Sequence, residues 1–131
     1  MINTPTATSV TMESVIESVN NPWALLFSGS VAKGGWLSMN EDPRNYRFFQ
    51  VMLDDQNIGL MCYWNPQKTH ISGCGSWDDS TATYVNTALI TNAGSADPSK
   101  RYQLISASYH TLLNGSTPGY AQNVTAIYGC R

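Results

Sequence analysis

Charge is scarce in this chain. Its 131 residues include only 7 Lys and Arg and 9 Asp and Glu, which is 12 % of the sequence and about half the usual share in globular proteins. The net charge of −2 offers no basic surface for nucleic acid or for an anionic membrane. Polarity therefore falls to Ser, Thr, Asn, Gln and Gly, which suit strands and turns better than exposed helices.

Long apolar runs and paired cysteine motifs are also missing. No stretch is long enough to span a bilayer, and residues 1–5 lack the basic and apolar regions of a signal peptide. We therefore expect a soluble protein that is made in the cytoplasm. Cys62, Cys74 and Cys130 cannot all pair within one chain, and none has the CxxC spacing of a zinc site. We expect three buried thiols, with a Cys62–Cys74 disulfide as the less favoured alternative.

Alternating apolar and polar residues, separated by turn signals, continue from Trp23 to the end of the chain. This pattern predicts one all-β head domain over residues 23–131, an antiparallel β-sandwich of about eight strands, with a compact barrel as the alternative. Trp23 and Tyr46 are expected in its core. The expected strands are residues 23–30, 36–39, 46–53, 58–64, 70–74, 83–91, 102–111 and the C-terminal segment from Val124.

The C-terminal segment is expected to be the closing strand of the fold. A strand so close to a chain end stays ordered only when it is tied into a sheet. Strand periodicity places alternate residues on opposite faces. One face is expected to carry Val124, Ala126 and Tyr128, and the other Thr125, Ile127 and Gly129.

Residues 1–22 are expected to form a stem before the head domain. Met12, Val15, Ile16 and Val19 recur at i, i+3, i+4 and i+7, which predicts one apolar stripe on a short helix. Two helical turns do not persist alone in water. The helix therefore needs a partner, either its own domain or copies of itself in a short coiled coil.

Four segments follow an ordered pattern. Residues 23–29 read Trp-x-Leu-Leu-x-x-Gly, residues 36–38 form a small Leu-Ser strand, Asn45 and Tyr46 precede an apolar strand, and residues 124–129 end in Ile-Tyr-Gly. This pattern resembles the C-terminal head domain of bacteriophage tail fibres and related receptor-binding tips. The central residues 65–83 depart from the family pattern.

The resemblance implies the tip of a tail fibre, a homotrimer in the virion that contacts other phage tail proteins. Such a tip binds a bacterial surface glycan or an outer-membrane protein, without nucleic-acid binding or membrane insertion. Three identical weak sites raise apparent affinity by multivalency. The stripe of Met12, Val15, Ile16 and Val19 would then nucleate the trimer. The alternative is a structural knob or decoration protein that does not bind the host.

Aromatic residues are plentiful, with 4 Trp and 7 Tyr. Rings at strand–loop junctions beside Asn, Gln and Asp combine an apolar face with hydrogen-bonding groups, as sugars require, and such rings also anchor protein interfaces. Packing against the core or a neighbouring subunit is the alternative role for these rings. The predicted receptor-binding residues are Trp64, Trp77, Asp78, Asp79 and Tyr120.

Catalytic motifs are weak. His70 and His110 are not accompanied by a Gly-x-Ser-x-Gly elbow, and adjacent acidic residues such as Asp54 and Asp55 point apart on an extended chain. No calcium loop of the Asp-x-Asp-x-Asp-Gly type is present. We therefore predict a non-enzymatic protein with no cofactor and no metal. A small glycan hydrolase or esterase is the enzymatic alternative.

Overall fold

The computed structural model of the chain describes residues 12, 22–54, 59–78, 83–112 and 119–131. The predicted stem helix therefore lies almost wholly outside the described residues, as do Val15, Ile16 and Val19; Met12 alone is described, and it is exposed. No helix in these described ranges is long and apolar enough to cross a membrane.

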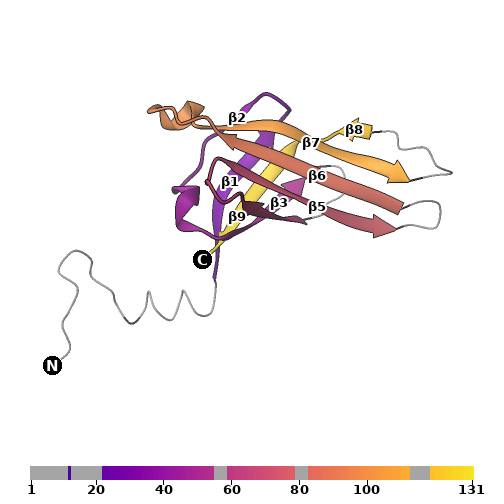
Figure 1. Cartoon of the computed structure of the whole chain (residues 1–131), viewed down its shortest axis with the longest axis horizontal. Helices are drawn as coiled ribbons and strands as arrows, with labels where there is room; N and C mark the ends of the chain where they lie inside the picture. Colours follow the sequence, from indigo (N-terminus) through magenta and orange to yellow (C-terminus); the bar gives the residue numbers. More distant parts are fainter. Residues whose placement is uncertain (1–11, 13–21, 55–58, 79–82, 113–118) are drawn as a thin grey trace.

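From Pro22 onward the described segments are mainly β-strands (Figure 1). The strands are β1 (Trp23–Val31), β2 (Trp36–Leu37), β3 (Phe48–Leu53), β4 (Gly59–Trp64), β5 (His70–Asp78), β6 (Thr83–Asn92), β7 (Tyr102–Leu112), β8 (Gly119–Ala121) and β9 (Val124–Cys130). Two short 3-10 turns, η1 (Pro43–Asn45) and η2 (Pro98–Lys100), lie between strands. The expected strands are confirmed, β5 is longer than expected, and β8 is additional.

All nine strands belong to one antiparallel sheet in the order β1-β9-β3-β4-β5-β6-β7-β2, with β8 also paired to β7. The sheet curls until its edges approach each other. Beyond β2 the chain returns to β1, where the Asn40 N–H donates to the Leu26 carbonyl at 2.7 Å. The all-β antiparallel prediction is confirmed, but a single, nearly closed sheet replaces the expected sandwich. Hydrogen-bonded pairing continues from β1 to β2, so no break divides the sheet into two layers.

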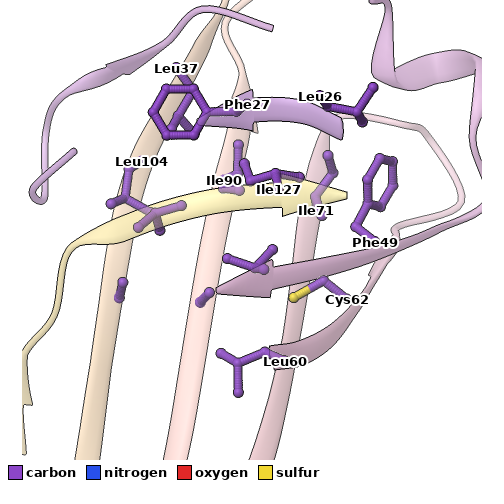
Figure 2. Close-up of a cluster of buried hydrophobic side chains, with 14 of the residues drawn as sticks. Leu26, Phe27, Leu37, Phe49, Leu60, Cys62, Ile71, Ile90, Leu104 and Ile127 are labelled. Carbon is purple, nitrogen blue, oxygen red and sulfur yellow. The ribbon is translucent and has the colours of Figure 1, made fainter. Parts of the chain in front are cut away.

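The core fills the inside of this rolled sheet (Figure 2). Period-two alternation turns the apolar residues of each strand inward, so that Phe49, Val51 and Leu53 of β3 are all fully buried. Ile90 of β6 and Ile127 of β9 belong to the same buried cluster. Burial of such aliphatic and aromatic side chains is the main favourable term in folding.

β9 is held between β1 and β3, with hydrogen-bonded pairing on both sides. The prediction that the terminal strand is tied into the sheet is confirmed. Tyr128 and Ile127 lie on opposite faces, as predicted: Tyr128 pairs with the exposed Leu25, and Ile127 is buried. Val124 is predicted on the same face as Tyr128, but it is buried like Ile127, so the prediction is wrong there. The cause is a register shift opposite Met52 on β3, because an irregular step in the pairing reverses the alternation at the start of β9.

The end of β9 packs tightly over Tyr46. A Cβ atom on Gly129 would lie only 2.7 Å from the Tyr46 ring, so this position has no room for a side chain. The Tyr46 hydroxyl donates to the Glu41 carboxylate and accepts from Arg131 Nη2 at 3.2 Å. Tyr46 is buried, as predicted. Trp23, also predicted in the core, is only half-buried and shares the outward face of β1 with Leu25.

The three cysteines are free thiols. Cys62 faces the core from β4, whereas Cys74 is exposed on β5 and Cys130 is half-buried. Gly73, the residue paired with Cys62, shares a face of β5 with the buried Ile71, so its neighbour Cys74 points the other way. The expected burial holds for Cys62 alone, and burial raises the pKa of its thiol to about 12.

Candidate ligand-binding face

Three long strands, β5, β6 and β7, run past the ends of β1, β3 and β9 (Figure 1). We call this projecting part the arm, and it comprises residues 75–78, 83–86 and 108–112. The short strand β8 pairs with β7 along one edge of the arm, from Ser108 to His110. The inner face of the arm continues the core-facing side of the sheet. Tyr84 and Asn86 lie on the same face of β6 as the buried Ala88 and Ile90, because alternate residues of a strand share a face.

Three tyrosines line this inner face, and we call them the tyrosine face. Tyr84 of β6 and Tyr109 of β7 meet edge to face, with ring centroids 5.9 Å apart. Tyr109 and Tyr120 of β8 are stacked, with centroids 4.8 Å apart and planes 23° apart. The register explains the stacking, because Tyr109 and Tyr120 are directly paired across β7 and β8. The Tyr120 side chain remains 48 % exposed, so one side of the stack is open to solvent.

Asn86 lies deeper on the same face. Its side chain is fully buried, and neither amide atom has a hydrogen-bond partner in the described part of the chain. Asn86 pairs with Gly75 on β5 and with Tyr109 on β7. A buried amide without a partner lowers stability. The Asn86 amide, next to the tyrosine face, is therefore expected to lower the stability of the folded chain.

The opposite face of β6 and β7 carries a row of polar side chains. Thr87 Oγ1 lies 3.2 Å from Ser108 Oγ, which in turn lies 3.2 Å from His110 Nε2. A serine–histidine contact is the first part of a hydrolytic site, which also needs a group that orients the histidine and donors for an oxyanion. Within the described residues no carboxylate bonds to His110. Ser108 and His110 also lie within β7, where backbone N–H groups are used in strand pairing.

The structure brings some of the predicted site residues together. Tyr120 belongs to the tyrosine face, and Trp77 pairs with Tyr84 in the backbone register. The expected strand ends at residue 74, which would leave Trp77 and Asp78 at the start of a loop. They lie instead in the extended end of β5, because the β5–β6 pairing continues to Asp78 and Thr83. Asp78 is exposed, and Asp79 lies outside the described residues.

Trp64 does not belong to this group, because its backbone pairs with Ile71 near the start of β5. It ends β4, as predicted, but its ring packs edge to face on Phe49 at 5.7 Å and lies beside Tyr102. Its indole N–H donates to the Pro43 carbonyl at 3.1 Å. Both the ring and the polar group of Trp64 are thus used within the fold.

Sequence reasoning missed Tyr84, Tyr109 and Asn86 as site residues. Alternation alone indicates that Tyr84 and Asn86 share one face of a strand. It does not give the register that sets Tyr109 beside both of them, because that register depends on where β6 and β7 turn.

A second surface feature lies on the outside of the roll, which we call the outer apolar face. Four side chains on it are 40–50 % exposed: Leu25, Phe48, Met61 and Tyr63. Phe48 and Tyr63 are paired across β3 and β4, with their rings 5.6 Å apart. The strands that make this face, β1, β9, β3 and β4, contain no Asp, Glu, Lys or Arg. Monomeric proteins rarely expose contiguous apolar patches of this kind.

In the described ranges no three His, Cys, Asp or Glu side chains are grouped so that they could hold a metal ion. No protein-family model, curated protein or solved structure matches this chain.

Proposed function

We propose that this chain is a non-enzymatic adhesion domain, the receptor-binding tip of a phage tail fibre, and that it binds saccharide through the tyrosine face. The observation that carries the proposal is the Tyr120 ring, which is stacked on Tyr109 and half exposed on a strand that is paired to the arm. A stacked ring is held in place on one side and presents its other side to the C–H face of a sugar. The Tyr120 hydroxyl, at the edge of the exposed ring, supplies a hydrogen-bonding group for sugar hydroxyls.

A single site of this size binds weakly, so the proposal includes assembly of several copies. The outer apolar face is the surface we assign to contact between copies, and a homotrimer is the assembly that the resemblance to fibre tips implies. Because this face carries no charge, two copies can approach without burying an unpaired charge. Three arms on one fibre would then bind a cell surface with far higher apparent affinity than one arm.

Adsorption of the fluorescently labelled full chain to a panel of bacteria tests the binding function. We expect adsorption to at least one strain, and we expect Tyr120→Ala to reduce it by about tenfold or more, since aromatic anchors dominate such contacts. Trp36→Ala is the matched control, because Trp36 is an exposed aromatic residue on β2, away from the arm. Adsorption that survives Tyr120→Ala would place the receptor site elsewhere, and the absence of adsorption to every strain would favour the structural knob.

Light scattering tests the assembly separately. We expect a mass near three times 14.4 kDa. Phe48→Lys places a charge on the outer apolar face and should yield smaller species, whereas Ser106→Lys, on β7, should not. A monomeric wild-type chain would contradict the trimer without bearing on the sugar site.

One observation favours a second candidate function, ester hydrolysis. Ser108 Oγ and His110 Nε2 are 3.2 Å apart on the outward side of β7. Release of acetate from acetylated polysaccharide that is lost in Ser108→Ala would support an esterase. Equal release by both proteins, or none, would leave the adhesion proposal in place.

A further inference from the structure

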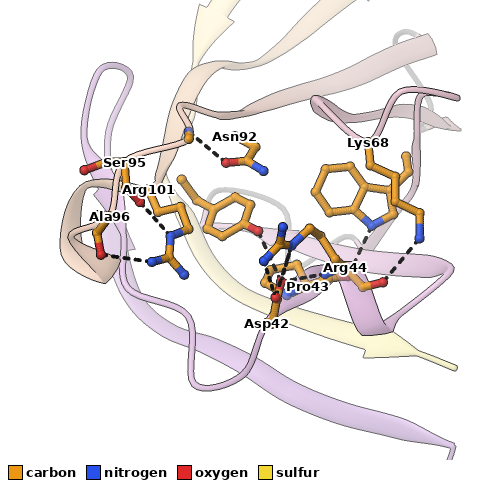
Figure 3. A network of polar contacts seen from close by, with 11 residues as sticks. Asp42, Pro43, Arg44, Lys68, Asn92, Ser95, Ala96 and Arg101 are labelled. Carbon is orange, nitrogen blue, oxygen red and sulfur yellow. Dashed lines mark hydrogen bonds and ion pairs between the residues drawn. The ribbon is translucent and has the colours of Figure 1, made fainter.

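A hollow lies toward the opposite end of the long strands, and two arginines are among the residues that line it (Figure 3). Its volume is about 280 Å³, and we call it the arginine hollow. Eight residues of β6 separate it from the tyrosine face, which is about 26 Å along a strand. The inference that follows therefore does not rest on the saccharide site. The residues that line the hollow are Arg44, Asn92, Gly94, Ser95, Ala96 and Arg101.

Arg101 is fixed in place by backbone groups. Its Nε donates to the Ser95 carbonyl at 2.8 Å, and its Nη2 donates to the Ala96 carbonyl at 3.0 Å. Carbonyl oxygens orient a guanidinium group but do not neutralise its charge. Within the described segments the ion pairs are Arg44–Asp42 and Arg131–Glu41, so Arg101 has no carboxylate partner there. A positive charge is thus held rigidly at the wall of the hollow.

Arg44 is the second cation, and it is held by Asp42 at the start of η1. Asp42 accepts from the Arg44 backbone N–H at 3.0 Å and from its Nη2 at 2.8 Å. Because these hydrogen bonds favour the ionised carboxylate, Arg44 lowers the pKa of Asp42. This pair is fixed but close to neutral, so the net charge of the hollow comes from Arg101 and its neighbours.

The wider surroundings are positive in a chain that is negative as a whole. The segments that meet here carry four cations, Arg44, Lys68, Lys100 and Arg101, against the three carboxylates of Glu41, Asp42 and Asp97, a local balance of +1. Asp97 is already bonded to Ser99, whose Oγ donates to it at 2.8 Å. Asp97 keeps its negative charge, and Lys100 and Arg101 contribute to lowering its pKa after the hydrogen bonds from Ser99, but within the described residues neither Asp42 nor Asp97 forms an ion pair with Arg101.

Asn92 adds a neutral donor to the hollow. Its Oδ1 accepts from the Gly94 N–H at 2.9 Å, which fixes the orientation of the side-chain amide. Its Nδ2 group has no hydrogen-bond partner in the part of the chain that the structure describes. The amide N–H bonds and the guanidinium N–H bonds are all donors, and the group that satisfies donors of this kind is an anion with several oxygens.

We propose that the arginine hollow binds a single oxyanion, the carboxylate or phosphate group of a small ligand or of an acidic glycan. Arg101 and Arg44 supply charge-assisted hydrogen bonds, and Asn92 Nδ2 supplies a neutral one. The volume lies just below the usual range of 300–1,000 Å³ for ligand pockets, which suits one anionic group and its immediate carrier. A neutral sugar gains nothing from the positive charge, so charge is the feature that distinguishes ligands here.

Titration of the ¹⁵N-labelled full chain, followed by NMR at low salt, tests this proposal. The probes are sodium phosphate, sodium glucuronate and neutral glucose. We expect saturable shifts of the Gly94, Ser95 and Arg101 amides with at least one of the two anions and none with glucose, and added NaCl should weaken the binding. Phosphate alone, or glucuronate alone, would identify which oxyanion the hollow takes.

Asn92→Asp is the decisive variant. It keeps the oxygen that accepts from Gly94 but places a negative charge in the hollow, so anion affinity should fall by about tenfold or more. Arg47→Gln is the matched control, because Arg47 is an exposed arginine just before β3 and its loss should leave affinity nearly unchanged. Absence of saturable shifts with both anions, equal shifts with glucose, or unchanged affinity in Asn92→Asp would overturn the proposal.

Discussion

The buried amide of Asn86 leads to a stability prediction that can be worked through from the structure. In the wild type both the carbonyl and the amino group of Asn86 are buried without partners in the described residues. Burial of an unpaired amide costs about 1–3 kcal/mol in proteins. Asn86→Leu keeps the branched shape and removes the polar atoms. We therefore expect this substitution to raise the free energy of unfolding by about 1–3 kcal/mol. Such a gain is unusual, because most single substitutions in natural proteins lower stability.

Thermal unfolding followed by circular dichroism measures this effect. For a domain of this size, each kcal/mol moves Tm by about 3–5 °C, so Tm should rise by about 3–15 °C. Thr87→Val is the matched control on the same strand, because Thr87 Oγ1 has a partner in Ser108 Oγ. That substitution loses a hydrogen bond and should lower stability by up to about 1 kcal/mol.

A second variant separates the polar atoms from the volume of the side chain. Asn86→Ala also removes the amide but leaves a small void, so its stability should lie below that of Asn86→Leu. If both variants unfold more easily than the wild type by more than about 1 kcal/mol, the amide is satisfied in solution and the reasoning is refuted. If only Asn86→Leu is destabilised, the methyl groups of leucine overfill the site, and Asn86→Ala then carries the test.

Three further predictions concern the core end of the molecule. Gly129→Ala should lower the free energy of unfolding by about 1–3 kcal/mol in denaturant titration, because the new Cβ would lie 2.7 Å from the Tyr46 ring; equal stability would contradict the close packing. Arg44 lowers the pKa of Asp42 below its usual 3.8, so their pair stabilises the fold above that pH and loses this effect as pH falls. Asp42→Asn should therefore be less sensitive to acid than the wild type between about pH 5 and about pH 2, and parallel acid curves would refute this. The thiol of Cys62, with a pKa near 12, should resist a thiol reagent at neutral pH until the protein unfolds, whereas rapid labelling of all three cysteines in the native state would show that the core opens.

The sequence predicts the strands well because each one obeys a local rule. Residues 48–53 form an apolar stretch interrupted only by Gln50, and the alternate positions Phe49, Val51 and Leu53, which share one face of a strand, are the buried ones. The closing strand is also predictable, since β-branched and aromatic residues continue almost to the last residue. These features need no knowledge of which strand lies beside which.

Non-local features are the ones that the sequence leaves open. The roll depends on the return of the chain from β2 to β1 through Asn40, and no local pattern specifies that contact. The length of β5 depends on pairing with β6, so a segment rich in Ser and Asp becomes a strand when its partner is present. The irregular step that turns Val124 inward depends likewise on β3. Register and curvature are properties of pairs of strands, whereas periodicity is a property of one.

The two candidate sites differ in the same way. Tyr120 could be singled out from the sequence because an aromatic residue after a long polar loop is conspicuous. The arginine hollow could not, because its walls come from η1 and from the connection between β6 and β7, and only the fold brings Arg44 to Arg101.

The two candidate sites lie toward opposite ends of the long strands of one small sheet. The half of β5, β6 and β7 that lies within the roll is buried under β1, β9 and β3, and its side chains, such as Ile71, Ile90 and Leu104, are apolar. The arm extends past the ends of β1, β3 and β9, and there the same alternation places Tyr84, the buried Asn86 and Tyr109 on the inner face. The strand pairing of the roll continues without interruption into the arm, from Ile71–Ile90 to Asp78–Thr83 on β5 and β6. The fold therefore places the tyrosine face on strands that are anchored in the core, while its aromatic rings pack on one another.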